Sequence, residues 1–224
     1  MKAHYHIHLE KYSLQKFKHN LESRDMIPSR VSLKEDLDDR FRVLDNAGIT
    51  NLKELVTALK TKPKVEEFSK ETGLSIQYLT LLSREARSYL PNPVRLDKFS
   101  GVSSATIEKL EATGIKNSRH LFNAVQTKAE REELAQQVEI PIEHLDELFG
   151  LSDLSRVYGV GPVFARMIYD VGIQSVRKFV RYSANEFINI YEAQTQKKAD
   201  FGINEIEFSL ILARELEVVV DSDN

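Results

Sequence analysis

The short sequence Gly159-Val160-Gly161-Pro162 carries the clearest chemical signal in the chain. Two glycines around an apolar residue allow a sharp backbone turn, because glycine adopts conformations that a Cβ atom disfavours. Pro162 suits the first turn of a helix, where its missing N–H would have had no partner. Backbone amides at such a turn and at the following helix N-terminus form a concavity that binds anions. The residues therefore predict a site for a phosphate group.

Basic residues gather around this turn. Five basic residues and one acidic residue lie between 156 and 181, whereas one basic and eight acidic residues lie between 130 and 153. Lysine and arginine near a phosphate contact add the salt-sensitive part of the affinity. A solvated helix face is the alternative interpretation of each charge. The side chains expected to assist the turn are Arg156, Arg166, Arg177 and Lys178.

The chain contains an internal duplication. Residues 44–82 align without gaps on residues 110–148, with 13 identities in 39 positions. A third copy follows the second, so that Gly101 corresponds to Gly159 and Gly114 corresponds to Gly172. Self-similarity of this kind is typical of repeated supersecondary units.

The glycine turn weakens from the third copy to the first. The second copy has Gly101-Val102-Ser103, in which only the first glycine is retained. The first copy has Lys34-Glu35-Asp36-Leu37 at the corresponding place, where two acidic side chains would repel a phosphate. We therefore expect at most two of the three copies to bind an anion, with Gly101, Val102 and Ser103 forming the weaker site.

The copies are predicted to be helical. Apolar residues recur at helical spacing, and Gly48, Gly114 and Gly172 stand where helices commonly end in a left-handed residue. Polar residues just after these glycines offer N-caps for the next helix. The predicted fold class is therefore all-α, built from tandem repeats. The segments 3–9 and 217–220 are candidates for a small strand pair between the two ends of the chain.

Proline-containing breaks and the limits of the copies predict four segments. An N-terminal extension covers 1–30 and contains a helix from Leu14 to Glu22 with Ser13 as its N-cap. The first repeat covers 31–90 and has the degenerate hairpin. The second repeat covers 91–151, and the third covers 152–224 with the full glycine hairpin.

The pattern in the third copy resembles the helix-hairpin-helix motif, which binds the phosphate backbone in DNA polymerases, ligases and repair nucleases. The residues that carry the resemblance are Leu154, Val157, Gly159, Gly161, Pro162, Ala165, Gly172 and Ile173. The three-copy layout and the Pro28-Ser29-Arg30 sequence before the first copy are similar to the bacterial domain-of-unknown-function 4332 family, over roughly residues 30–215 and most clearly in the second and third copies. The resemblance implies tandem helix-hairpin-helix-like repeats and binding of duplex nucleic acid without a cofactor.

Three histidines near the N-terminus are a possible metal site. His4, His6 and His8 alternate, so on a strand they would share one face. Imidazole nitrogens of this kind bind zinc or nickel. The polar face of an edge strand is the alternative that we favour, because no convincing fourth ligand is evident beyond Glu10.

The composition excludes several classes of function. The 224 residues include no cysteine, which rules out disulfides, thiolate metal sites and cysteine nucleophiles. The sequence has no P-loop, serine-triad signature or H-E-x-x-H motif. Adjacent carboxylates such as Glu66-Glu67 do not share a helix face. We therefore expect a protein that is not an enzyme and needs no cofactor.

The formal net charge of −3 is not that of a strongly basic nucleic-acid-binding protein. No apolar run is long enough to span a membrane, and no secretory signal is evident, so we expect a cytoplasmic protein with no membrane partner. The expected partner is DNA or RNA, bound without sequence preference through the hairpin amides. The alternative is a scaffold for protein–protein interactions that binds no nucleic acid.

Overall fold

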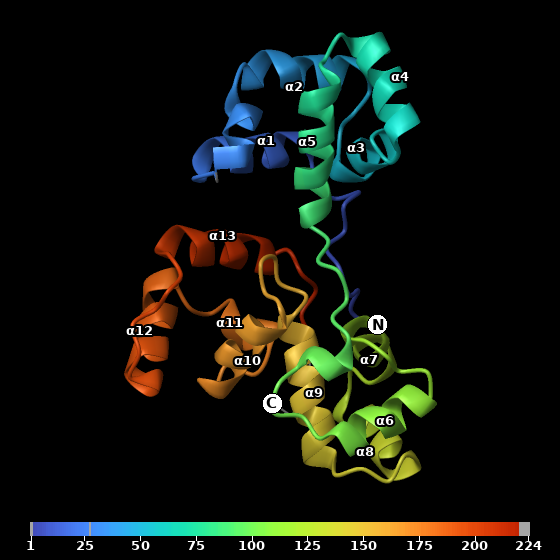
Figure 1. Cartoon of the computed structure of the whole chain (residues 1–224), viewed down its shortest axis with the longest axis vertical. Helices are drawn as coiled ribbons and strands as arrows, with labels where there is room; N and C mark the ends of the chain where they lie inside the picture. Colours follow the sequence, from blue (N-terminus) through green and yellow to red (C-terminus); the bar gives the residue numbers. More distant parts are fainter. Residues whose placement is uncertain (1, 27, 220–224) are drawn as a thin grey trace. The chain divides into compact units, whose positions relative to one another are not determined.

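The computed structural model describes residues 2–26 and 28–219 (Figure 1). The regular elements of these residues are helices, and the extended backbone forms only two isolated bridges, Ser13 with Asn51 and Arg95 with Asn117. The predicted all-α fold class is therefore confirmed. In the described part of the chain, no helix is long and apolar enough to cross a membrane.

The chain divides into two compact units. The small unit contains His8–Tyr89, and the large unit contains the chain up to Ile7 together with the chain from Leu90 onward. The segment predicted as a separate N-terminal extension, 1–30, is therefore divided between the two units. The predicted start of the second repeat, residue 91, lies one residue after Leu90.

The small unit is a bundle in which α5 packs against α3, α4 and η1. Its core contains Phe17, Phe41, Leu44, Leu79 and Leu82, all with at most 1% of their surface exposed. Ser13 caps the first helix as predicted, because its side chain accepts a hydrogen bond from Lys16 N. The elements are α1 (Leu14–Ser23), the 3₁₀ helix η1 (Pro28–Lys34), α2 (Leu37–Asn46), α3 (Leu52–Ala58), α4 (Lys62–Thr72) and α5 (Ile76–Ser88).

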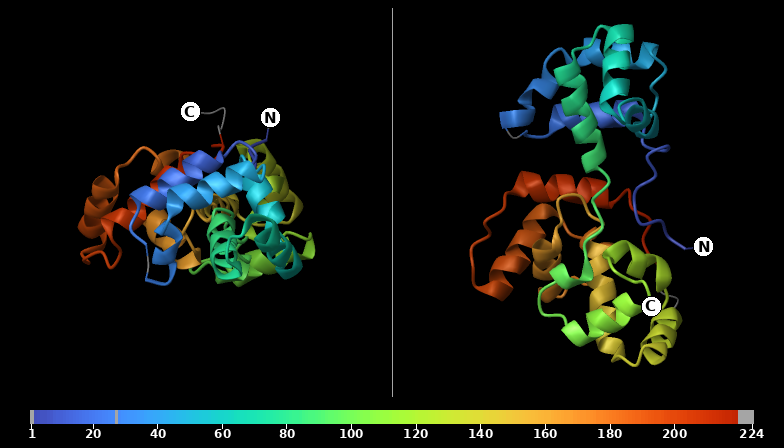
Figure 2. Two further views of the ribbon diagram at one scale, coloured as in Figure 1. Left: turned by 90° about the horizontal axis from the view of Figure 1, so that it is seen from above. Right: turned by 45° about the vertical axis from the view of Figure 1, so that its right-hand side comes forward.

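The large unit is arranged around α9, which lies beside α7, α8 and α10 (Figures 1 and 2). Leu145, Leu148, Leu151 and Leu154 of α9 are fully buried, so this helix supplies the centre of the core. The elements are η2 (Leu96–Lys98), α6 (Ser104–Ala112), α7 (Ser118–Ala124), α8 (Lys128–Gln137), α9 (Ile142–Leu154), α10 (Pro162–Asp170), α11 (Val176–Phe179), α12 (Ala184–Thr195) and α13 (Ile203–Ala213).

The order of helices recurs three times, as α2–α5, α6–α9 and α10–α13. The predicted turns recur with it, since Gly48, Gly114 and Gly172 follow the first helix of each series with φ of +83°, +91° and +82°. Backbone hydrogen bonds recur as well. They join the segment before each of the first two series to that series, since Leu14 N of α1 donates to Thr50 O and Leu96 N of η2 donates to Lys116 O.

The predicted pair of terminal strands, 3–9 and 217–220, is wrong. Neither 3–9 nor 217–219 is a strand, and Val220 lies outside the described residues. In place of a ladder, Arg156 donates to the carbonyl oxygens of His4, Tyr5 and Glu217. The Tyr5 hydroxyl also lies 2.5 Å from Ser118 Oγ, which fixes the N-terminal segment against α7.

Candidate anion-binding sites

The turns before α6 and α10 have closely similar backbones. Gly101 and Gly159 adopt φ of +80° and +78°, a left-handed conformation that residues with a Cβ atom rarely adopt. Gly161 differs, because its φ of −82° and ψ of −178° are open to any residue. No heavy atom lies within 4 Å of a Cβ atom added to Gly161. The first glycine of each turn is thus required by conformation, whereas Gly161 is not.

The amides of the third hairpin are only partly available. Val160 N donates to Val157 O at 3.1 Å and Val160 is buried, so the prediction that this amide faces a phosphate is wrong. The amides of Gly161, Val163 and Phe164 are not engaged in this way, because none of them has a hydrogen-bond acceptor among the described residues. Gly161 is exposed, and Val163 is 70% exposed. The donors open at the start of α10 are therefore the amides of Gly161, Val163 and Phe164, and not that of Val160.

The helices that follow the two hairpins lack a side-chain N-cap, as do α9 and α13. Ser103 makes no side-chain cap bond at α6, and Gly161 has no side chain to cap α10. Pro141 likewise provides no cap at α9. In contrast, α7, α8, α11 and α12 begin with side-chain acceptors, namely Asn117, Thr127, Ser175 and Ser183. An uncapped N-terminus keeps unsatisfied N–H groups and a partial positive charge, both of which favour an anion.

In the first copy, the corresponding helix start is acidic. Asp36 adopts φ of +47° before α2, and Asp38 and Asp39 occupy the first turn of that helix. Asp36 also lies 3.7 Å from Arg40, measured from Oδ2 to Nη2. These carboxylates already complement the helix N-terminus, so the structure gives α2 no open anion site.

Arg156 cannot contact a phosphate, which corrects its predicted role. The residue is 1% exposed, and its guanidinium forms an ion pair with Asp153 as well as bonds to carbonyl oxygens of both terminal segments. It also lies 4.1 Å above the Phe122 ring. The side chain holds the large unit together.

Arg166 is mostly buried between the two hairpins. Its Nη1 lies 2.7 Å from Glu147 Oε1 and 3.1 Å from Asp170 Oδ1, so its charge is neutralised. Its Nε and Nη2 atoms are buried and have no acceptor. Nη2 lies 3.5 Å from the position that a Cβ atom would take on Gly101, which places the guanidinium beside the second hairpin.

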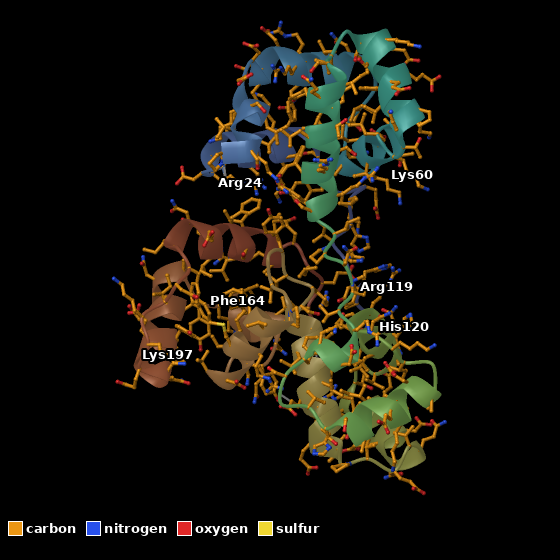
Figure 3. All side chains as sticks on the ribbon, viewed as in Figure 1. Arg24, Lys60, Arg119, His120, Phe164 and Lys197 are labelled. Atoms are coloured by element: carbon orange, nitrogen blue, oxygen red, sulfur yellow. The ribbon has the colours of Figure 1, made fainter. Side chains whose placement is uncertain are left out.

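Helix α13 packs against one side of the third hairpin. The Tyr158 and Phe208 rings meet edge to face with centroids 4.9 Å apart, and Ser209 Oγ lies 3.5 Å from a Cβ atom added to Gly159. Phe164, which is labelled in Figure 3, is also engaged. Its ring contacts the rings of Phe187 and Phe201. Neither flanking aromatic ring is therefore free to stack on a base.

Arg177 and Lys178 lie away from the hairpin. They follow the C-terminal end of α10 and line a cavity of about 560 Å³, together with Arg131 and Arg181. Sequence reasoning missed Arg131 and Arg181 as members of this group. The spacing of Arg177 and Arg181, four residues apart, was the one signal that could have linked two of them.

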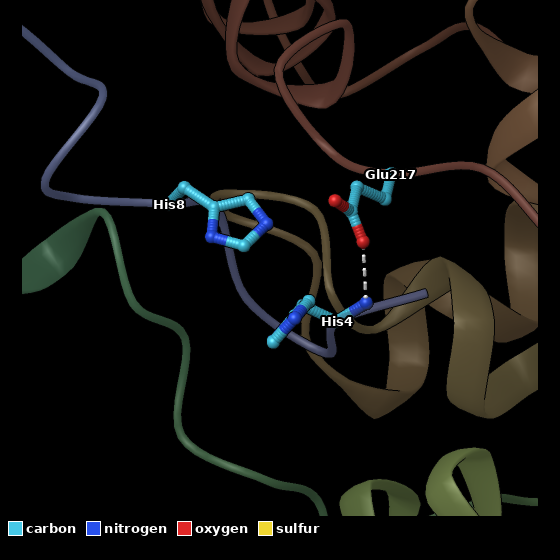
Figure 4. Close-up of side chains that lie close together, drawn as sticks. All are labelled: His4, His8 and Glu217. Carbon is cyan, nitrogen blue, oxygen red and sulfur yellow. Dashed lines mark hydrogen bonds between the residues drawn. The ribbon is translucent and has the colours of Figure 1, made fainter. Parts of the chain in front are cut away.

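The three histidines do not form the predicted face of a strand. His4 N donates to Glu217 Oε2 at 2.8 Å (Figure 4). His6 is half-buried, and burial, followed by the charges of Arg119 and Arg156, lowers its pKa to about 4. His8 belongs to the small unit, where its Nδ1 lies 3.0 Å from Glu10 Oε1.

Comparison with known families identifies the middle of the chain. Residues 100–202 match the family described as Domain of unknown function (DUF4332). This segment is a DUF4332 domain. The resemblance to the DUF4332 family is thereby confirmed for residues 100–202, whereas the helix-hairpin-helix-like character of the repeats stays a prediction. The DUF4332 segment contains both glycine hairpins and the basic residues of the cavity. Comparisons with curated proteins and with solved structures give no match.

Proposed function

We propose that the DUF4332 segment binds the backbone of DNA or RNA without sequence preference and without catalysis, in the cytoplasm. The observation that supports this most strongly is the pair of uncapped helices, α6 and α10, each of which begins three residues after a left-handed glycine. The contacts would be made by the Gly161, Val163 and Phe164 amides and, at the second hairpin, by the amides at the start of α6. Amides at a helix start bind phosphate oxygens and carry no base information.

The direct test is fluorescence anisotropy with labelled duplex and single-stranded oligonucleotides. We expect binding at about 50 mM salt that weakens strongly at about 200 mM, because phosphate binding releases counterions. The same affinity for unrelated sequences is expected. Absence of binding at the lower salt concentration would contradict the proposal.

The sharpest variant is Gly161→Asp, which supplies the missing cap. The backbone at Gly161 is already extended and has room for a side chain, and extended backbone with an Asp side chain is favourable at an N-cap. The carboxylate would accept the open amides of α10 and repel phosphate. We expect unchanged or slightly higher thermal stability and an affinity about tenfold lower, equivalent to about 1.4 kcal/mol.

Ser183→Asp is the matched control, because it adds the same charge at α12, where the cap bond already exists. Its affinity for nucleic acid should stay close to that of the unmodified protein. Equal affinity of Gly161→Asp and the unmodified protein would show that the α10 amides do not bind the backbone.

A scaffold for protein partners is the second candidate, favoured by the 70% exposure of Val163 on α10. The two candidates differ in one experiment. Capture of a defined protein after nuclease treatment, abolished by Val163→Asp and not by Ser183→Asp, would favour the scaffold.

A further inference from the structure

The cavity beside α9 and α11 has an excess of positive charge. Four basic side chains line it: Arg131, Arg177, Lys178 and Arg181. Its two lining carboxylates are already neutralised. Asp146 pairs with Arg131 at 2.5 Å, and Asp153 pairs with the buried Arg156 and accepts from Val176 N at 2.7 Å.

The remaining three cations have no partner among the described residues. Arg177, Lys178 and Arg181 form no ion pair and no side-chain hydrogen bond among the residues that the structure describes. Arg177 on α11 and Arg181 in the turn that follows this helix both line the cavity. A multiply charged anion is the ligand that would complement them.

The walls of the cavity are held firmly in place. Arg131 is 7% exposed, donates to Gln126 O at 3.1 Å and lies 4.8 Å above the Phe149 ring. Gly150 lets α9 approach the opposite wall, because an added Cβ atom would lie 2.6 Å from Tyr169 Cε2 and 2.8 Å from Gln174 O. A glycine inside a helix destabilises the helix by about 1 kcal/mol relative to alanine. The close packing of α9 against Tyr169 and Gln174, which shapes this wall, therefore has a cost in helix stability.

We propose that this cavity binds a phosphate monoester, with Arg177, Lys178 and Arg181 contacting the phosphate oxygens. Guanidinium groups suit this ligand because they donate paired hydrogen bonds to phosphate. The volume of about 560 Å³ accommodates more than the phosphate alone and falls in the range of small-molecule sites. The ester is either a free nucleotide or the terminal phosphate of a nucleic acid.

This site is separate from the proposed backbone contacts. Arg177 and Lys178 follow the C-terminal end of α10, whereas the open amides lie at its N-terminus, and a nine-residue helix is about 13 Å long. The proposal therefore stands without the proposed function.

The experiment is a calorimetric titration of the full chain with inorganic phosphate, adenosine monophosphate and adenosine. Binding of phosphate and of the monophosphate, with none of adenosine, is expected. The double variant Arg177→Gln/Arg181→Gln should weaken that binding at least about tenfold. The matched control, Lys197→Gln/Lys198→Gln, removes two exposed charges near the end of α12 and should bind normally.

Oligonucleotides with a 5′-phosphate or a 5′-hydroxyl separate the two sources of the ester. If the 5′-phosphate raises the affinity and the arginine double variant loses that gain, the ligand is a nucleic-acid terminus. If the free monophosphate binds and the 5′-phosphate gives no gain, the ligand is a nucleotide. The 5′-hydroxyl oligonucleotide tests backbone binding alone. The cavity proposal would be overturned if phosphate and the monophosphate failed to bind and the 5′-phosphate gave no gain over the 5′-hydroxyl, or if the double variant and its control bound equally.

Discussion

Arg156 and Arg177 are basic residues of the same repeat in opposite environments. Arg156 is 1% exposed, pairs with Asp153 and donates to three backbone carbonyls, whereas Arg177 lines an open cavity and has no ion pair within residues 2–26 and 28–219. In the sequence, both lie near the glycine hairpin. Their environments differ because residues 4, 5 and 217, which are far from residue 156 in the chain, pack against Arg156. Charge counted along a sequence therefore could not identify which arginine is available to a ligand.

Replacing Arg156 with methionine should destabilise the large unit. The substitution leaves Asp153 buried without its cation and removes the donors to His4 O, Tyr5 O and Glu217 O. Breaking a buried ion pair in this way costs about 3–5 kcal/mol. Lys178→Met, at an exposed position, should cost less than about 0.5 kcal/mol. Urea unfolding of both variants measures the difference, and unchanged stability of Arg156→Met would contradict a structural role.

The elements were more predictable than their contacts. Gly48, Gly114 and Gly172 mark helix ends because a left-handed residue is needed there, and this requirement is local to the sequence. The same locality explains the correct start of α1 after Ser13. The cavity around Arg131 and Arg181 could not be predicted, because it depends on how α8, α9 and α11 meet in space. The prediction of terminal strands was wrong for a similar reason, because Arg156 donates to carbonyl oxygens that would otherwise accept hydrogen bonds between the two strands.

The two glycines of the third hairpin should respond differently to alanine. Gly159 has φ of +78°, so Gly159→Ala should lower the free energy of unfolding by about 1–2 kcal/mol. Gly161→Ala should be close to neutral, because its backbone is extended and its surroundings are empty. Thermal and urea unfolding of the two variants compare them directly. A larger loss for Gly161→Ala than for Gly159→Ala would contradict the conformations described above.

At the scale of the whole chain, each unit has its own buried ionic cluster. In the small unit, Glu85 on α5 is fully buried and pairs with Arg24 and Arg30. In the large unit, Asp153 and Arg156 are buried together. Each cluster joins segments distant in sequence: Arg24 and Arg30 bring the chain around η1 to α5, and Arg156 brings both terminal segments to the end of α9. The cost of losing either cluster should therefore fall on its own unit.

Hydrogen exchange can test this separation with Glu85→Gln. The substitution removes the charge that Arg24 and Arg30 share, so both cations lose their buried carboxylate, and breaking such a cluster costs about 3–5 kcal/mol. Amides of α1, α2 and α5 should then exchange faster, by a factor that reports the lost stability of the small unit. Amides of α9 and α10 should keep their protection. In Arg156→Met the pattern should be reversed. Amides of α9 and α10 should exchange faster, and amides of α5 should exchange at their original rate. Equal loss of protection across both units in either variant would show that the chain unfolds as one cooperative body, since a single transition exposes all amides at the same free energy.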